Sequence, residues 1–335
     1  MARSPGRKPG QPSAEASNPG FAWGDYVDWL VETHGTLAAV AEKLASHRAF
    51  ADDVGSIERA LRRLRGRGQL AGGTWGARAL AAFGVPSAAG ERTRWMGSYH
   101  SRFVDLPVPI CQELVRLWDR PPISEAPEAR VWLALAHATN TLRSADVAAA
   151  APHLRRARAS IALAPIEATI ELLLVEAFVA SREDPAKVPA LLDQIGPLFE
   201  EAKPSADRAC LFARYIDQRA WQINKGRAGA KDHAKAEKLY ASIPTKDAPP
   251  FALCRRENGL AYGRWKQGDR ASAIEHARNA VRHAGDGGHV RLRAMALTML
   301  GKILGDDEGA AAKERAIAIV TDLDDEALRL RFTSR

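Results

Sequence analysis

The stretch Leu260–Ala280, LAYGRWKQGDRASAIEHARNA, decides the fold class of this chain. Gly268-Asp269 divides it in the middle, and a glycine there permits a tight turn between two antiparallel helices. Ala273, Ala277 and Ala280 follow at helical spacing, and such small side chains let the axes of two helices approach closely. The stretch therefore predicts a helical hairpin.

Similar hairpins are predicted along most of the 335 residues. Helix pairs should begin near Pro127, Pro165, Ser205, Phe251 and His289, at intervals of 38 to 46 residues. Helix-rich periods of this size are typical of a stacked solenoid. Strand-like alternation is absent from this region. We therefore predict an all-α fold in which residues 88–335 form a right-handed solenoid of about six α-α hairpins.

The hairpin at Leu260–Ala280 resembles a tetratricopeptide repeat. Leu260-Ala261 stands where that family has its Leu-Gly pair, and Gly268-Asp269 fits the turn between its two helices. Leu300-Gly301 restarts the pattern forty residues later. The resemblance implies a tetratricopeptide-like array over about 88–325, in which the first helix of each hairpin lines the concave face.

Polar side chains on those first helices are the candidates for ligand binding that the resemblance implies. Their amide and hydroxyl groups suit an extended peptide backbone, although ordinary solvated positions are the alternative. The candidates are Asn140, Gln218, Gln222, Asn258 and Tyr262. Whether the solenoid binds a peptide, a small molecule or a protein stays open, as does the formation of a homodimer.

The first 86 residues differ in character from the repeats. Residues 1–20 are rich in Pro, Gly, Ser and basic residues, so we expect a disordered basic tail. Three amphipathic helices should follow between residues 21 and 68, the second capped by Thr36 and the third by Asp53. A domain boundary is predicted at about residue 88, and a helix over 91–104 should follow it.

Residues 21–86 resemble a helix-turn-helix DNA-binding domain. The matching residues of the supporting helix are Thr36, Ala41 and Leu44, and those of the recognition helix are Ile57, Leu61 and Leu64. The stretch Gln69–Gly76, QLAGGTWG, would be a short wing, a β-hairpin with Gly72-Gly73 at its tip.

Positive charge is concentrated in this N-terminal part. Between Arg59 and Arg94 the chain has eight arginines and a single acid, Glu91, although the net charge of the whole chain is only +8. Guanidinium groups on an exposed helix face can pair with guanine or with phosphates in DNA. The residues expected to contact DNA are Ser56, Arg59, Arg62, Arg63 and Arg67.

Other chemistry is not indicated by the sequence. The sequence has no stretch of eighteen apolar residues, no phosphate-binding loop and no metal-ligand or nucleophile motif. The three cysteines are far apart and each is flanked by apolar helical positions, which predicts buried thiols in a reducing compartment, the cytoplasm. We expect no enzyme activity, no cofactor, no metal and no membrane association.

Two functions remain as interpretations of the sequence. The first is a DNA-binding transcriptional regulator whose solenoid senses a ligand or binds a partner. The second is a non-enzymatic tetratricopeptide-like scaffold or adaptor, whose N-terminal helices only cap the solenoid and have a solvated arginine face. A site for RNA or another polyanion is a separate alternative for these arginines. The local charge favours the regulator, whereas the connection from Leu44 to Val54, longer than the usual turn of the motif, favours the adaptor.

Overall fold

The computed structural model describes residues 20–46, 53–227 and 229–333. All regular structure in these ranges is helical, which confirms the predicted all-α class. The predicted basic tail lies outside the described residues except for Gly20, and so does most of the connection between the second and third helices.

Three helices begin the described chain, α1 (Trp23–His34), α2 (Leu37–Ala45) and α3 (Val54–Arg65). Both predicted caps are confirmed. Thr36 Oγ1 accepts a hydrogen bond from the backbone N–H of Ala39 at 3.1 Å, and Asp53 Oδ1 accepts one from Ser56 at 3.0 Å. The apolar sides of these helices, including Ile57 and Leu61, are fully buried.

The predicted wing is wrong, because a helix begins inside the stretch 69–76. That helix, α4 (Gly73–Phe83), follows a short turn. Trp23 packs against this turn, and its indole Nε1 donates a hydrogen bond to Leu70 O at 2.9 Å. A Cβ atom on Gly72 would lie 2.2 Å from Trp23 Cζ2, so the glycines of QLAGGTWG admit an indole ring and do not form a hairpin tip.

The single helix predicted over 91–104 is also wrong. Helix α5 (Ser87–Gly97) ends early, a 3-10 turn η1 (Arg102–Asp105) follows, and α6 (Val108–Trp118) comes next. The backbone of Gly97 lies directly against that of Trp132, since a Cβ there would meet Trp132 O at 2.4 Å. This close approach needs glycine, and the chain leaves the helix at Ser98 in an extended conformation.

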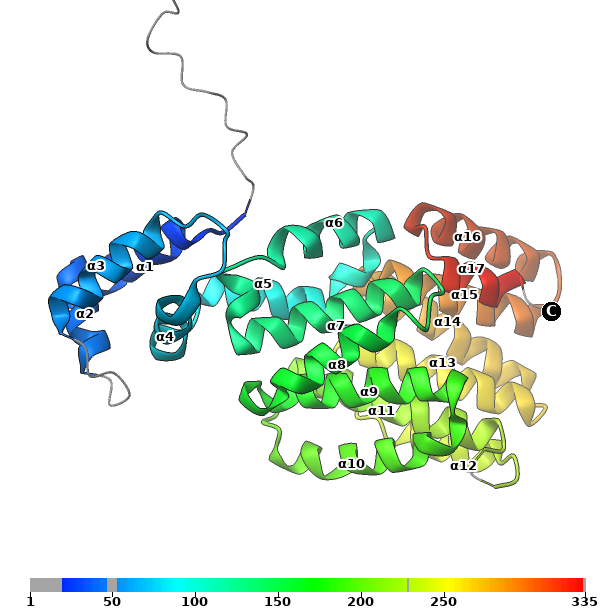
Figure 1. Cartoon of the computed structure of the whole chain (residues 1–335). Helices are drawn as coiled ribbons and strands as arrows, with labels where there is room; N and C mark the ends of the chain where they lie inside the picture. The colour runs from blue at the N-terminus through cyan, green and yellow to red at the C-terminus, as the bar shows by residue number, and fades with distance from the viewer. Residues whose placement is uncertain (1–19, 47–52, 228, 334–335) are drawn as a thin grey trace, which may run out of the picture.

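Five helix pairs and a final short helix make up the remainder (Figure 1). They are α7 (Pro127–Arg143) with α8 (Ala150–Ser160), α9 (Ile166–Glu183) with α10 (Val188–Glu201), α11 (Ala206–Asn224) with α12 (His233–Ala241), α13 (Pro250–Lys266) with α14 (Arg270–Asp286), α15 (Val290–Leu304) with α16 (Asp307–Leu323), and then α17 (Glu326–Thr333). Single 3-10 turns precede α7, α9 and α10, namely η2 (Ile123–Glu125), η3 (Ile161–Leu163) and η4 (Pro185–Lys187). All five predicted helix starts are confirmed to within one residue.

Contacts between the helices follow a regular order. The two helices of each pair pack together, and the first helices of successive pairs, α7, α9, α11, α13 and α15, contact one another in sequence. The last helix, α17, contacts α7, so the end of the chain returns to the beginning of the paired region. Figure 1 shows α1–α4 at one end of the molecule, away from these pairs.

A buried ion cluster lies where the beginning of α17 meets α7 and α15. The carboxylate of Asp325, just before α17, accepts hydrogen bonds from Arg143 Nε on α7 at 2.9 Å and from Arg291 Nε on α15 at 2.8 Å. The Asp325 side chain is completely buried and that of Arg143 is only 1% exposed. Burial opposes ionisation of Asp325, but the two guanidinium groups outweigh it and hold the pKa of that carboxyl below its usual value.

The segment between α5 and η1 reaches the same cluster. The guanidinium carbons of Arg214, Arg255 and Arg291 lie 4.5, 5.9 and 5.3 Å from the ring centroid of Tyr99. Arg291 also donates a hydrogen bond to the Tyr99 hydroxyl. Burial alone would raise the pKa of Tyr99, but the three positive charges lower it. Tyr99 therefore joins α11, α13 and α15 on the side where the first helices meet.

A tight contact between α12 and α13 gives the first prediction. A Cβ on Gly259 in α13 would lie 2.1 Å from Tyr240 Cδ1 in α12, so Gly259→Ala should overpack this contact and lower the free energy of unfolding by about 1–3 kcal/mol. The control is Gly285→Ala in α14, where a Cβ would meet no atom within 4 Å and should be neutral or stabilising. Urea unfolding of both variants compares the two, and equal stability would refute the packing described for Gly259.

The Asp325 cluster gives the second prediction. Asp325→Asn leaves two buried guanidinium groups without their carboxylate and should reduce the free energy of unfolding by about 3–5 kcal/mol at neutral pH. Because the folded pKa is depressed, this stabilisation is fully present above the unfolded value of about 3.9 and disappears as the pH falls through the folded value. The difference between wild type and variant should therefore shrink below about pH 4.

The control for this prediction is the neighbouring residue. Asp324 is exposed and has a φ of 49°, a conformation that Asn also adopts, so Asp324→Asn should change stability little. Chemical unfolding of both variants at pH 7 and at several acidic pH values measures the effect. Equal losses in the two variants at pH 7 would contradict the role assigned to Asp325.

Candidate functional site

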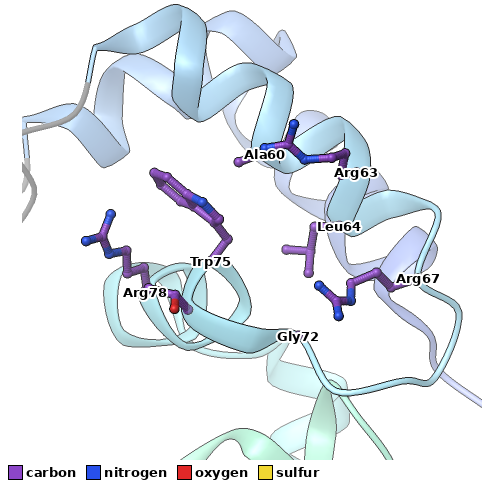
Figure 2. A pocket seen from close by; sticks show the side chains of 8 residues that line it. Ala60, Arg63, Leu64, Arg67, Gly72, Trp75 and Arg78 are labelled. Atoms are coloured by element: carbon purple, nitrogen blue, oxygen red, sulfur yellow. The ribbon is translucent and has the colours of Figure 1, made fainter.

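A cleft of about 380 Å³ lies between α3 and α4 (Figure 2). One wall comes from Ala60, Arg63 and Leu64 of α3 and the other from the first turns of α4, and the turn between the two helices closes one end. The lining residues are Ala60, Arg63, Leu64, Arg67, Gly72, Thr74, Trp75 and Arg78. The volume is within the range of ligand pockets in proteins.

The cleft is held in shape by contacts behind it. Leu64 turns its side chain into the core, whereas Arg63 beside it stays exposed. The turn before α4 is tied to η2, because the carboxylate of Glu125 accepts hydrogen bonds from the N–H of Gly72 at 3.1 and 3.3 Å. Trp23 packs under the same turn. The position of α4 relative to α3 thus depends on the buried core.

The charged side chains that line the cleft are all positive among the described residues. Three arginines, Arg63, Arg67 and Arg78, contribute to the lining, and no carboxylate of the described residues does. The guanidinium carbon of Arg78 lies 4.8 Å from the ring centroid of Trp75, a cation-π distance. Figure 2 shows Trp75 and Arg78 on α4 facing the α3 side chains across the cleft. Planar guanidinium groups around one cavity are suited to a phosphate or carboxylate.

The residues predicted to contact DNA fall into two groups. Arg63 and Arg67 line the cleft. The others are engaged with neighbours on α3 itself: Arg59 Nη2 donates to Ser56 Oγ at 2.9 Å, and Arg62 forms an ion pair with Glu58 at 2.5 Å. The side chain of Arg62 remains 66% exposed, so this pair is solvated and weak.

The sequence analysis did not place Trp75 or Arg78 in the site. Both were assigned to a wing or to the end of the domain, and neither was expected to face α3. A signal was available in their spacing of three residues, which puts an aromatic ring and a cation on the same face if the segment is helical. Because residues 69–76 were predicted to form a hairpin, the shared helix face of Trp75 and Arg78 was not predicted.

The five predicted ligand residues lie on α7, α11 and α13. Asn140 and Gln222 are buried, at 2% and 5% exposure, whereas the other three are half-buried. Gln218 Nε2 donates to Leu174 O at 2.8 Å. Asn140 has both amide atoms, and Gln222 and Asn258 have their carbonyl oxygens, buried without a hydrogen-bond partner among the described residues. Within that part of the chain, no hydrogen bond joins the five to one another.

Other kinds of site find little support in the described ranges. No group of three or more His, Cys, Asp or Glu in residues 20–46, 53–227 and 229–333 is arranged to hold a metal ion. The three cysteines are buried as predicted, and burial raises the pKa of Cys210 and of Cys254 to about 12, so neither thiol is poised as a nucleophile. A transmembrane span is not found among the helices described.

Comparisons with known proteins find no family model, no curated protein and no solved structure that matches this chain. The functional argument therefore depends on the geometry of the cleft and on the surfaces of the helix pairs.

Proposed function

We propose that this chain is a DNA-binding transcriptional regulator with a helical-repeat domain that senses a ligand or binds a partner. In this proposal the cleft between α3 and α4 binds the phosphate backbone of duplex DNA. The observation that carries it is the presence of Arg63, Arg67 and Arg78, from α3, the turn after it and α4, around one cleft whose lining among the described residues includes no acidic side chain.

In this proposal the two ends of α3 contact different parts of DNA. Arg63 and Arg67 lie in the last turn of α3 and just after it, and in the cleft they would neutralise phosphates. Ser56 and Arg59 lie in the first two turns of α3, the end of a recognition helix that meets base edges in the major groove. Their mutual hydrogen bond orients the Arg59 guanidinium before DNA arrives.

The remaining helices support the second half of the proposal. Ordered contacts between the first helices of successive pairs are what a right-handed tetratricopeptide-like solenoid requires. The side of the solenoid on which the first helices meet is partly filled by Tyr99, whose ring lies among Arg214, Arg255 and Arg291. A ligand of the solenoid would therefore bind beyond this cluster, nearer the ends of the first helices.

The adaptor remains the alternative, and one observation favours it. The largest buried cluster runs without a break from Trp23 in α1 to Ala136 in α7, across the domain boundary predicted at residue 88. The N-terminal helices are thus joined to α7 by one continuous core that passes through α5 and α6, and a structural role of this kind needs no DNA. The binding experiment below separates the two functions.

The third prediction concerns the salt dependence of DNA binding. If Arg63 and Arg67 each neutralise a phosphate, the logarithm of affinity should fall with the logarithm of salt concentration by about 0.9 for each contact. Arg63→Ala/Arg67→Ala should then weaken binding to all duplexes alike and reduce this slope by about 1.8. Fluorescence anisotropy with a duplex from upstream of the gene and a scrambled duplex, across a salt series, measures both quantities.

A matched control is Arg155→Ala on α8, which also removes an exposed positive charge but lies far along the chain from the cleft. It should leave the slope unchanged. Arg59→Ala should instead cost about 1–3 kcal/mol on the preferred duplex only, because it removes a base contact. Equal affinity of the wild type for the two duplexes would rule out the regulator and support a basic cap on an adaptor.

A further inference from the structure

The cleft between α3 and α4 has an apolar part that a phosphate group does not fill. Ala60 and Leu64 line it, and each is only 2% exposed, so their side chains form a floor that belongs to the core. The indole of Trp75 is half-buried and packs against the same core. A phosphate loses hydration next to apolar surface, so it would stay among the guanidinium groups. The floor and the indole therefore indicate a ligand that has an apolar, planar part as well as a charge.

The exposed arginines of the cleft lie beside this apolar part. Arg63 and Arg67 are both exposed, and Figure 2 shows them on the α3 side of the cleft. Arg67 also reaches the beginning of α4, because a Cβ on Gly73 would lie 3.8 Å from Arg67 Nη1. The positive end of the α4 dipole lies at the same place and favours an anion there. A phosphate is thus expected at this end of the cleft.

Trp75 and Arg78 supply two planar surfaces in the same cleft. The guanidinium carbon of Arg78 is 4.8 Å from the ring centroid of Trp75, and their spacing of three residues puts both on one face of α4. Nucleobases stack on aromatic rings and on guanidinium planes. The cleft has one surface of each kind, in contact with one another, beside the cations that would hold a phosphate. This combination is suited to a base and a phosphate joined in one molecule.

The size of the cleft limits what can reach its floor. A volume of about 380 Å³ admits one small molecule or one residue of a chain, and not a duplex. An intact duplex presents its phosphates to the mouth of the cleft while its bases stay paired and stacked, and taking a base out of the stack costs free energy. The floor and Trp75 would then remain uncontacted. A ligand that reaches both parts of the cleft needs a base that is already unpaired.

We propose that the cleft binds a single nucleotide, with its phosphate between Arg63 and Arg67 and its base against Trp75. The nucleotide is either free or an unpaired residue of a DNA strand, and the same contacts serve both. This inference rests on the proposed function for the phosphate site and adds a site for the base. Duplex DNA and a free nucleotide then need the same arginines, so each should displace the other from the cleft.

The experiment is calorimetric titration of the full-length protein with deoxyadenosine monophosphate and with inorganic phosphate at low salt. The wild type should bind the nucleotide about fivefold to a hundredfold more tightly than phosphate, the effect of stacking one base. Trp75→Leu keeps an apolar side chain but removes the ring, so it should abolish this difference and leave the affinity for phosphate unchanged. Trp75→Phe keeps a ring and should retain most of the difference, which separates loss of stacking from loss of folding.

The matched control is Trp221→Leu on α11. Trp221 is also half-buried and also contacts a guanidinium group, since the guanidinium carbon of Arg227 lies 4.5 Å from its ring centroid. This variant should bind the nucleotide as the wild type does, whereas Arg67→Ala should weaken nucleotide and phosphate alike. Two results would overturn the proposal: equal affinity of the wild type for nucleotide and phosphate, or equal nucleotide affinity in Trp75→Leu and Trp221→Leu.

A single-stranded oligodeoxyadenylate and a fully paired duplex identify the source of the nucleotide. If Trp75→Leu weakens binding of the single strand as well as of the free nucleotide, the ligand is an unpaired residue of a strand, and a loss for the free nucleotide alone assigns the free form. The duplex affinity of Trp75→Leu should equal that of the wild type. Nucleotide binding without preference between duplexes would therefore remove the regulator and keep the nucleotide site, whereas duplex preference without a Trp75 effect would remove only the nucleotide site.

Discussion

The carboxylate of Asp325 is the interaction on which the arrangement of the paired helices depends. It is buried between Arg143 from the first pair and Arg291 from the last, residues that are far apart along the chain. Two guanidinium groups in such a place are tolerated because this carboxylate neutralises them, while Tyr99 accepts a further hydrogen bond from Arg291 and Leu106 O accepts one from Arg143. The contact brings α17 against α7 and keeps the first helices turned toward one another.

The same principle explains which positive charges are available for binding. Inside the helix pairs, Arg214 is matched by Glu171 and Arg255 by Asp217, so those cations serve the structure. The cleft between α3 and α4 differs, because Arg63, Arg67 and Arg78 line it and no carboxylate of the described residues belongs to that lining. Planar guanidinium groups suit an extended phosphate backbone, which is the ligand proposed above for this cleft.

Local chemistry made much of the fold predictable. Helix starts at proline or at a capping Thr or Asp depend on a few neighbouring residues, and those predictions are confirmed. The two errors came from glycines. Gly72 was interpreted as a turn tip and Gly97 as an ordinary helical position, but each is shaped by a tryptophan far away in sequence, Trp23 and Trp132 respectively. No local pattern contains that information.

From the sequence alone came the all-α class, the starts of the first three helices and of the five helix pairs, and the concentration of arginines between residues 59 and 94. These follow from periodicity, capping and composition, which act over a few residues. The tertiary structure alone decided that Trp75 and Arg78 line one cleft with residues of α3, that α17 returns to α7, and that Asp325 meets Arg143 and Arg291. Each of these needs side chains from separate helices in one place, and only the packing of the core brings them together.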